Sequence, residues 1–197
     1  EIVSPEDRLA FLKAKLKGKR LPKVSVAVLE RYFGGISIET WRTWLPWRLP
    51  NLVVERHFGG ITIDPAAETE VIYWLQKLGF TVVSQKGDTL SSWAKTYFAD
   101  ANVGVPKEIQ KVDVLIVGEA FSELALREGN LVSGKARVEL QAIDRRTGQV
   151  LSIDRETGTA VDLSEQIAAT KALQKATGNL CYRLIPEFVD NWIGRPK

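Results

Sequence analysis

The residue types that enzymes most often use as nucleophile and base are rare in this sequence. His57 is the single histidine and Cys181 the single cysteine, so a thiol–imidazole dyad would have to join these two distant positions. His57 takes the place of Tyr32 in a repeated segment, which indicates an aromatic position and not a base. Cys181 stands beside Leu180 in a helical pattern and is interpreted as a small core residue. The sequence therefore predicts no Cys–His dyad.

Acidic residues are common, but their spacing does not define a metal site. Asp144, Asp154 and Asp162 are predicted at turns or strand ends, where aspartate often accepts bonds from the local backbone. Glu119 and Glu123 fall on one line of a predicted strand, with no third acid placed beside them. Neither Gly-Gly pair precedes the residues of a phosphate-binding loop. We expect no catalytic residue, metal or cofactor, with an enzyme of unrecognised type as an alternative.

The most distinctive local feature is a repeated segment. Residues Glu30–Glu39 return almost unchanged as Glu55–Asp64, and both copies contain Phe-Gly-Gly-Ile. Paired glycines permit backbone conformations that other residues avoid, and each copy ends in a strand-like alternation. We interpret residues 30–64 as an inserted hairpin arm that offers aromatic side chains to a partner. The predicted contact residues are Tyr32, Phe33, Trp41, Trp44, Trp47, His57 and Phe58.

Other interpretations of this insert stay open. Trp41, Trp44 and Trp47 could fold back over the core, or tryptophan with arginine could contact a membrane surface. The basic stretch Lys13–Lys23, together with the Trp-Arg segment, could instead bind single-stranded nucleic acid. Because 24 acidic residues nearly balance 27 basic ones, we do not expect nucleic acid to be the partner.

Hydrophobic periodicity predicts an α/β (α+β) domain. Apolar alternation and short β-branched runs indicate strands, whereas apolar residues at helical spacing indicate helices. The expected strands are 24–29, 80–83, 112–117 with an extension towards 126, 131–144 and 150–161, and the expected helices are 5–16, 65–78, 89–101 and 165–188. Hairpins beside strand–helix–strand units favour a mixed sheet of about five strands with helices packed on it. The residues expected on the buried face of the last helix are Ile167, Ala168, Leu173, Leu180, Leu184 and Val189.

The bulk composition is that of a globular domain. The chain has 197 residues, of which 45% are apolar and 26% charged, and its net charge is +3. No apolar run reaches the length of a membrane-spanning helix. Because the sequence begins with Glu1 and contains no methionine, we expect a processed chain from which a secretory signal has been removed. We divide it into an N-terminal helix with a basic linker, 1–22, and a single domain, 23–197, that carries the insert.

Several stretches taken together resemble a known family. They are Lys23–Leu29 (KVSVAVL), Leu78–Val83 (LGFTVV), Asp113–Ala120 (DVLIVGEA), Ala142–Leu151 (AIDRRTGQVL), and Gln166–Ala168 with Ala172–Leu173. In this order they resemble the CsgG and TolB N-terminal-like domains of the bacterial cell envelope. Members include the curli secretion channel, penicillin-binding-protein-activator lipoproteins and the flagellar protein FlgT. The resemblance covers residues 23–190 except the insert.

The resemblance implies a non-enzymatic, TolB-N-like domain that docks onto partner proteins or assembles with further copies of itself. It implies a role in assembly, secretion or scaffolding, and a periplasmic or outer-membrane-associated location that is compatible with a lipoprotein and with peripheral membrane contact. The family offers no catalytic residues to carry over. Because the chain lacks a cysteine near its start and a clear pair of lipid-facing hairpins, we do not extend the resemblance to a pore.

Overall fold

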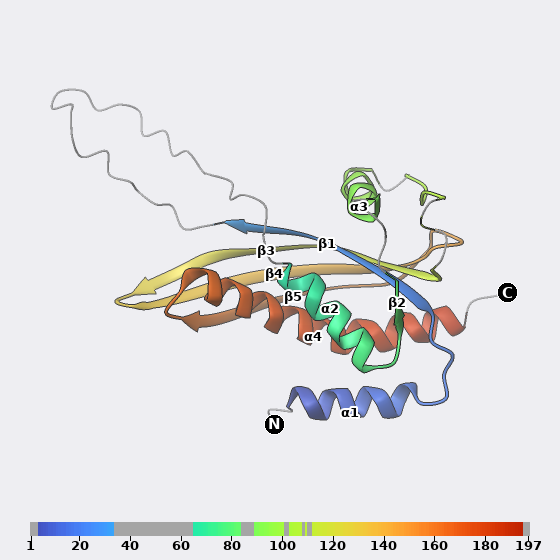
Figure 1. Cartoon of the computed structure of the whole chain (residues 1–197), viewed down its shortest axis with the longest axis horizontal. Helices are drawn as coiled ribbons and strands as arrows, with labels where there is room; N and C mark the ends of the chain where they lie inside the picture. The colour runs from blue at the N-terminus through green and yellow to red at the C-terminus, as the bar shows by residue number, and fades with distance from the viewer. Residues whose placement is uncertain are drawn as a thin grey trace.

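Five strands form one mixed sheet, which confirms the predicted fold class (Figure 1). The structure is a computed structural model that describes residues 4–33, 65–83, 89–100, 103–107, 109 and 112–194. The strands are β1 (Lys23–Phe33), β2 (Thr81–Val82), β3 (Val114–Glu128), β4 (Leu131–Asp144) and β5 (Val150–Asp162), in the order β2-β1-β3-β4-β5. β1 is parallel to β2 and β3, whereas β3, β4 and β5 are antiparallel neighbours. Of the predicted arm, 30–64, residues 30–33 are described and belong to β1, whereas residues 34–64 lie outside the described residues.

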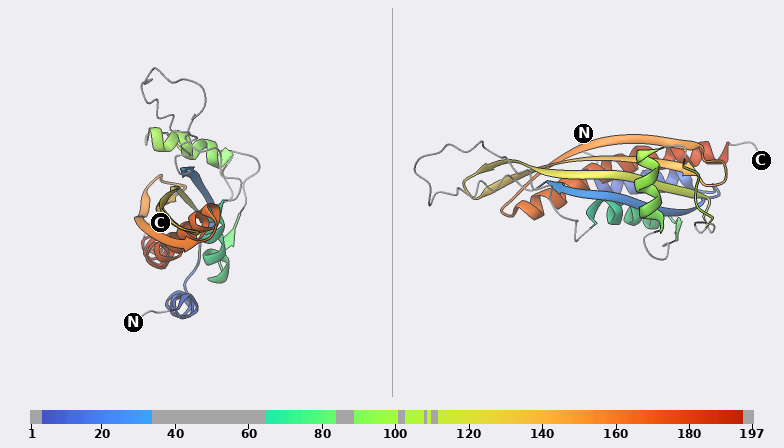
Figure 2. Two further views of the ribbon diagram at one scale, coloured as in Figure 1. Left: turned by 90° about the vertical axis from the view of Figure 1, so that its left-hand side faces the viewer. Right: turned by 90° about the horizontal axis from the view of Figure 1, so that it is seen from above.

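Helices cover the two faces of the sheet unequally (Figure 2). The four described helices are α1 (Pro5–Leu16), α2 (Ala66–Lys77), α3 (Thr89–Ala99) and α4 (Glu165–Ile193). α4, α2 and α1 lie on one face and share the larger core, whereas α3 lies on the other face over a smaller core. Leu180, Leu184 and Phe188 of α4 are fully buried in the larger core. Among the described helices we find no segment with the length and hydropathy of a membrane span.

β4 shows how one strand serves both faces. Val132, Gly134, Ala136 and Val138 are buried beneath α4, and the alternate residues Ser133, Lys135 and Arg137 point to the opposite face, as the alternation predicts. Towards the far end of β4 that opposite face is also covered, and Ile143 there joins the core under α3. The half of this face that lies away from α3 is not covered by any described helix (Figure 2).

Two glycines of the sheet allow α4 to approach the strands closely. A Cβ atom added at Gly158 would stand 2.4 Å from the backbone oxygen of Ala172. A Cβ atom added at Gly134 would stand 2.8 Å from backbone atoms of Ala168 and Ala169. The small side chains of α4 and the missing side chains of the sheet therefore define one close-packed contact.

The last helix begins at Glu165 as predicted, but its end and the orientation of Ile167 differ from the prediction. It continues to Ile193, beyond the expected end near residue 188, although Pro186 lies inside it. A proline inside a helix costs about 3 kcal/mol, but burial of Phe188 and Val189, both fully buried, offsets this penalty. The expectation that Ile167 is buried is wrong, because the contact with the sheet is made by small residues such as Ala168, and Ile167 points away from it.

β1 and β3 extend further than the sequence indicated. β1 was expected to end at Leu29, but its residues up to Phe33 pair with β3 up to Glu123. The predicted extension of β3 is confirmed and reaches Glu128. Charged residues such as Glu30 interrupt the apolar run of β1, so hydrophobicity alone does not indicate that the strand continues.

Candidate interaction surface

Most of the predicted contact residues lie outside the described part of the chain. They are Trp41, Trp44, Trp47, His57 and Phe58, which all belong to residues 34–64. Tyr32 and the backbone of Phe33 are described, and they form the end of β1 from which the insert leaves. The position of this exit is therefore fixed, at the end of the sheet shown on the left of Figure 1.

Tyr32 connects β1 to the beginning of α4. Its hydroxyl donates a hydrogen bond to Oε1 of Glu165, and Nη2 of Arg127 lies 3.4 Å from Oε2 of the same carboxylate. Partial burial, and then the neighbouring Glu165 carboxylate, raise the pKa of Tyr32 above its usual value. The structure thus gives Tyr32 an internal partner and brings three elements, β1, β3 and α4, together at this end.

Exposed apolar side chains gather beyond this cluster, around the tip of the β3–β4 hairpin. Leu126 and Leu131 flank the turn, and they are 62% and 53% exposed. Val161 at the end of β5, Leu163 in the β5–α4 connection and Ile167 in the first turns of α4 are also exposed, with Leu163 reaching 71%. We call these five residues the distal tip. Leu126, Leu131 and Val161 lie on the open face of the sheet, whereas Ile167 points away from the sheet on the side of α4, so the five residues surround this end of the molecule. Exposed large apolar side chains that lie together, as the first three do, are typical of a contact surface.

The strand register explains how the distal tip is assembled. Leu126 pairs with Ser133 of β4, and Ser133 pairs with Val161 of β5, so the three form one row across the strands. Because Val132 is buried beneath α4, its neighbours Leu131 and Ser133 point to the opposite face. The tip was missed by the sequence reading, although the alternation of residues 131–144 already places Leu131 off the buried line.

Between the distal tip and α3 the open face of the sheet is charged. Glu123 pairs across the strands with Lys135, and Phe121 pairs with Arg137, whose guanidinium carbon lies 6.0 Å from the ring centroid. The predicted common line of Glu119 and Glu123 is confirmed, since both are exposed and alternate with buried residues. Within the described ranges, no three His, Cys, Asp or Glu side chains come together as a metal site.

The structure decides the predictions about the aspartates and the cysteine. Asp144 accepts hydrogen bonds from the backbone of the turn that follows it, and Asp162 accepts one from Leu163 N–H, as predicted. Asp154 was wrongly placed at a strand end: it lies inside β5, because this strand runs without interruption from Val150 to Asp162. Cys181 is fully buried, and this burial raises the pKa of its thiol, which confirms it as a core residue.

Side chains of α4 cover the outer edge of β5, which is the last strand of the sheet. Asn191 Nδ2 donates to the carbonyl oxygen of Leu151 at 2.6 Å, Arg183 Nη2 to that of Arg155 at 3.2 Å, and Lys175 Nζ to that of Thr159 at 3.5 Å. The three acceptors recur at every fourth residue of the strand, and the three donors at every eighth residue of the helix. Carbonyl groups that would otherwise accept another strand are therefore occupied.

Arg183 is the centre of this cover. Its guanidinium group lies 2.7 Å from Oδ2 of Asp154 and 2.7 Å from Oε2 of Glu156, in addition to its bond to the strand. The hydrogen bond to Arg183 holds the pKa of Glu156 below its usual value. The same two carboxylates accept the backbone N–H groups of Arg155 and Thr157, so donors and acceptors of the edge are both engaged.

Glu30, the first residue of the repeated segment, binds the beginning of α2. Its Oε1 accepts the backbone N–H of Glu68 at 2.9 Å, and the Glu68 carboxylate in turn accepts the N–H of Val28 at 3.0 Å. Pro65 precedes α2 and provides no side-chain cap, so Glu30 performs this role from the neighbouring strand. Burial outweighs these bonds and raises the pKa of Glu30 to about 7. These two hydrogen bonds join β1, from which the insert leaves, to the first turn of α2, which follows the insert.

Glu30 is expected to make the protein less stable as the pH rises. The folded state keeps the proton up to about pH 7, whereas an ordinary glutamate releases it near pH 4.5. This contribution to the free energy of unfolding is complete below pH 4.5 and is lost as the pH rises through 7. After allowance for solvent screening, we expect the free energy of unfolding to fall by about 1–2 kcal/mol over this pH range. Glu30→Gln should reduce the fall of the free energy of unfolding with pH, measured by urea unfolding, whereas Glu123→Gln, on the exposed face, should not. An equal pH dependence for the unchanged chain and both variants would contradict the assignment.

The sequence matches no family model and no curated protein. A solved structure of a hypothetical protein from Chlamydia trachomatis is 14% identical, with a TM-score of 0.52 over 86% of this chain and 98% of that chain. Weaker similarity, with TM-scores of 0.41 and 0.34, is found to the PelC dodecamer from Paraburkholderia phytofirmans (16% identical, 82% and 87% covered) and to the LpoB C-terminal domain from Salmonella enterica (13% identical, 76% and 93% covered). The first similarity shows the shared fold, and the resemblance to CsgG and TolB domains stays a prediction.

Proposed function

We propose that this chain is a non-enzymatic assembly or scaffold domain of the bacterial cell envelope, periplasmic or attached to the outer membrane, that acts through protein–protein contacts, including contacts between its own copies. The observation that carries this proposal is the distal tip. Leu126, Leu131, Val161, Leu163 and Ile167 expose apolar surface at the end of the hairpins. Contact with a second protein surface would remove this apolar area from water.

The insert is part of the same proposal. It leaves β1 next to Tyr32, whose partner Glu165 stands two residues before Ile167 of the distal tip. The aromatic residues of the insert, Trp41, Trp44, Trp47, His57 and Phe58, together with Tyr32 and Phe33, are therefore proposed to extend the contact surface. Aromatic residues contribute more than most to the affinity of protein interfaces.

Removal of the apolar tip is expected to abolish self-association. Leu126, Leu131 and Val161 are all exposed, so replacing the three with serine should leave the core unchanged. We expect light scattering to show a defined multimer for the unchanged chain and a monomer for the triple variant, because loss of a central apolar contact costs about 2 kcal/mol or more for each important residue.

The matched control is Ile153→Ser, which removes another exposed apolar side chain, 60% exposed, from a different part of β5. It should keep the mass of the unchanged chain. A monomeric unchanged chain at high concentration would contradict self-association. A multimer that persists in the triple variant would contradict the role of the tip, and replacement of residues 34–64 with a short glycine–serine linker would then test the insert separately.

A further inference from the structure

Positive charge is concentrated in one short segment of the chain. Ser4–Lys23, which comprises α1 and the linker to β1, contains seven basic and two acidic residues, a net charge of +5. The whole chain has a net charge of +3, so the rest of the molecule is net negative. Glu6 and Asp7 belong to the first turn of α1, where they complement the helix dipole. Beyond that turn every charged residue of the segment is basic. An asymmetry of this kind is typical of a surface that meets an anionic partner.

Only part of this charge is needed to hold α1 in place. Arg8 donates a hydrogen bond to Asn179, Lys19 pairs with Asp190, and the guanidinium group of Arg20 lies 5.7 Å from the ring centroid of Trp192. These three contacts all go to α4. The remaining lysines of the helix and its end, Lys13, Lys15 and Lys17, are exposed, and none of them forms an ion pair with a described acidic residue.

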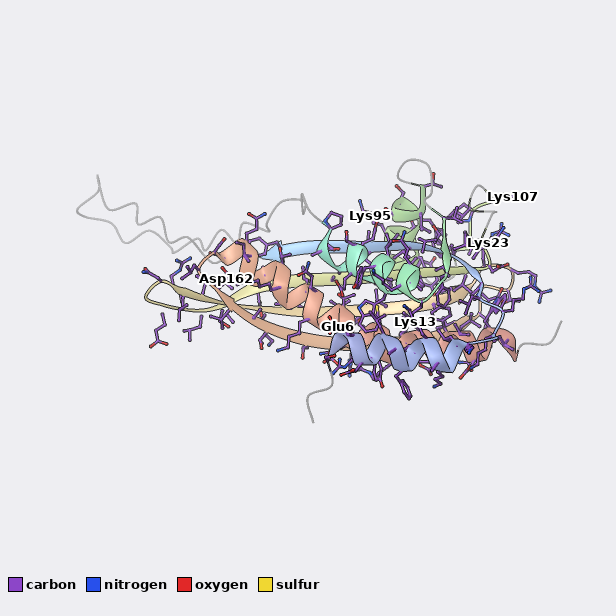
Figure 3. The ribbon with its side chains drawn as sticks, turned by 60° about the horizontal axis from the view of Figure 1, so that its bottom comes forward. Glu6, Lys13, Lys23, Lys95, Lys107 and Asp162 are labelled. Atoms are coloured by element: carbon purple, nitrogen blue, oxygen red, sulfur yellow. The ribbon has the colours of Figure 1, made fainter. Side chains whose placement is uncertain are left out.

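The outward face of α1 has a particular arrangement. Leu12 and Leu16 are buried against the core and fix which side of the helix faces inward. At 100° per residue the opposite side carries Asp7, Ala10 and Ala14, which are all exposed. Phe11 lies at the border of this side, 57% exposed, with its ring centroid 6.1 Å from that of Tyr182 in α4. The free lysines flank Ala10 and Ala14 on both sides. Figure 3 shows α1 on the outside of the molecule, with Lys13 labelled.

We propose that α1 docks on an anionic lipid surface. In this orientation Ala10, Ala14 and the exposed part of Phe11 meet the headgroup region beyond the first turn that holds Asp7, while lysines on both sides extend their charged ends to lipid phosphates. A nucleic acid fits this face less well, because binding of single strands relies on a groove with successive stacking aromatics. The face of α1 is convex and carries the single exposed ring of Phe11.

The surface is suited to orientation more than to permanent attachment. Each lysine near an anionic membrane improves binding about fivefold, so Lys13, Lys15 and Lys17 together supply roughly a hundredfold. Stable attachment requires a second signal besides such charges. The proposal extends the envelope location of the proposed function, but it uses α1, whereas self-association uses the distal tip. The two can fail separately, because one is measured on vesicles and the other by solution mass.

The test is co-sedimentation of the full chain with vesicles of mixed phosphatidylglycerol and phosphatidylcholine, at low and at high salt. The variant Lys13→Gln/Lys15→Gln/Lys17→Gln should bind roughly a hundredfold more weakly. The control Lys95→Gln/Lys107→Gln/Lys135→Gln removes the same charge from exposed positions away from α1, two of which are labelled in Figure 3. It should keep most of the binding. Ala14→Glu, which places a carboxylate in the middle of the outward face, should also weaken binding, and thermal unfolding verifies that each variant is folded.

Each outcome decides the proposal. The proposal is supported if only the α1 variants lose binding to the mixed vesicles. It also requires that the unchanged chain loses binding at high salt and on vesicles of phosphatidylcholine alone. Equal loss in both lysine triples would show that net charge, and not this helix, is responsible, and would overturn it. Absence of vesicle binding by the unchanged chain would also overturn it, as would binding of a single-stranded oligonucleotide through the same lysines without binding of vesicles.

Discussion

Gly158→Ala is expected to lower the free energy of unfolding by about 2–3 kcal/mol, which for a chain of this size corresponds to a fall in melting temperature of roughly 4–12 °C. The new Cβ atom would stand 2.4 Å from the backbone oxygen of Ala172 and 3.0 Å from the backbone nitrogen of Ala176. Both atoms belong to the helix backbone, so they cannot move aside as the end of a flexible side chain can. Either α4 is displaced from the sheet or β5 is distorted.

Two other glycines are matched controls for this prediction. Nothing lies within 4 Å of a Cβ atom built at Gly104, so Gly104→Ala should leave the melting temperature nearly unchanged. At Gly178 in α4 the nearest atoms lie at an ordinary distance of 3.5 Å, and alanine should stabilise the helix by about 0.5–1 kcal/mol. Thermal unfolding of the three variants checks the order. If Gly158→Ala unfolds at the same temperature as Gly104→Ala, the close helix–sheet contact described above is wrong.

Arg183→Ala is expected to have two effects, a loss of stability of about 1–2 kcal/mol and additional association through the edge of β5, beyond the multimer expected for the unchanged chain. The stability effect arises because Asp154 and Glu156, each 25% exposed, lose the cation that both share. The association arises because the carbonyl of Arg155 becomes available at the edge of the sheet. An edge strand with free backbone groups pairs readily with a strand of another molecule.

The measurements are thermal unfolding and light scattering over a range of concentrations. Arg146→Ala is the control, because Arg146 is an exposed arginine in the β4–β5 turn, away from the edge cover of α4. It should alter neither quantity. If Arg183→Ala matches this control in stability and in mass, α4 does not protect the edge of β5. A variant that loses stability but stays at its original mass would limit the role of Arg183 to the ion pairs.

Elements governed by local pattern were predictable from the sequence. β4 has the predicted bounds, because its apolar residues alternate without interruption from Val132 to Ala142. The mixed sheet followed from the order of such elements. Ends set by tertiary contacts were not predictable: α4 continues through Pro186 because residues beyond it are buried against the core, and sequence alone does not show what lies opposite them.

The candidate surface was less predictable than the fold. The repeated segment led to a predicted arm over residues 30–64, whereas the distal tip consists of single apolar residues from three strands, the β5–α4 connection and one helix. Leu126 and Val161 come together through the register of two hairpins, which hydrophobicity does not encode. The exchange between Glu30 and Glu68 likewise joins positions far apart in sequence. The basic composition of residues 4–23 is evident from the sequence. Which residues of α1 face outward follows only from the burial of Leu12 and Leu16.

The position of α4 in the chain affects how the molecule can be made. α4 follows all five strands, and its residues Leu180, Leu184 and Phe188 form the centre of the larger core. A ribosome therefore completes the whole sheet before the helix that covers it has been synthesised. Until then only α1 and α2 are available to cover part of the apolar side of the strands, and a chain interrupted before Glu165 would keep the rest of that side exposed to water and to its neighbours. The larger core can therefore close only after the C-terminal helix has been made, so folding of this molecule is a late event in its synthesis.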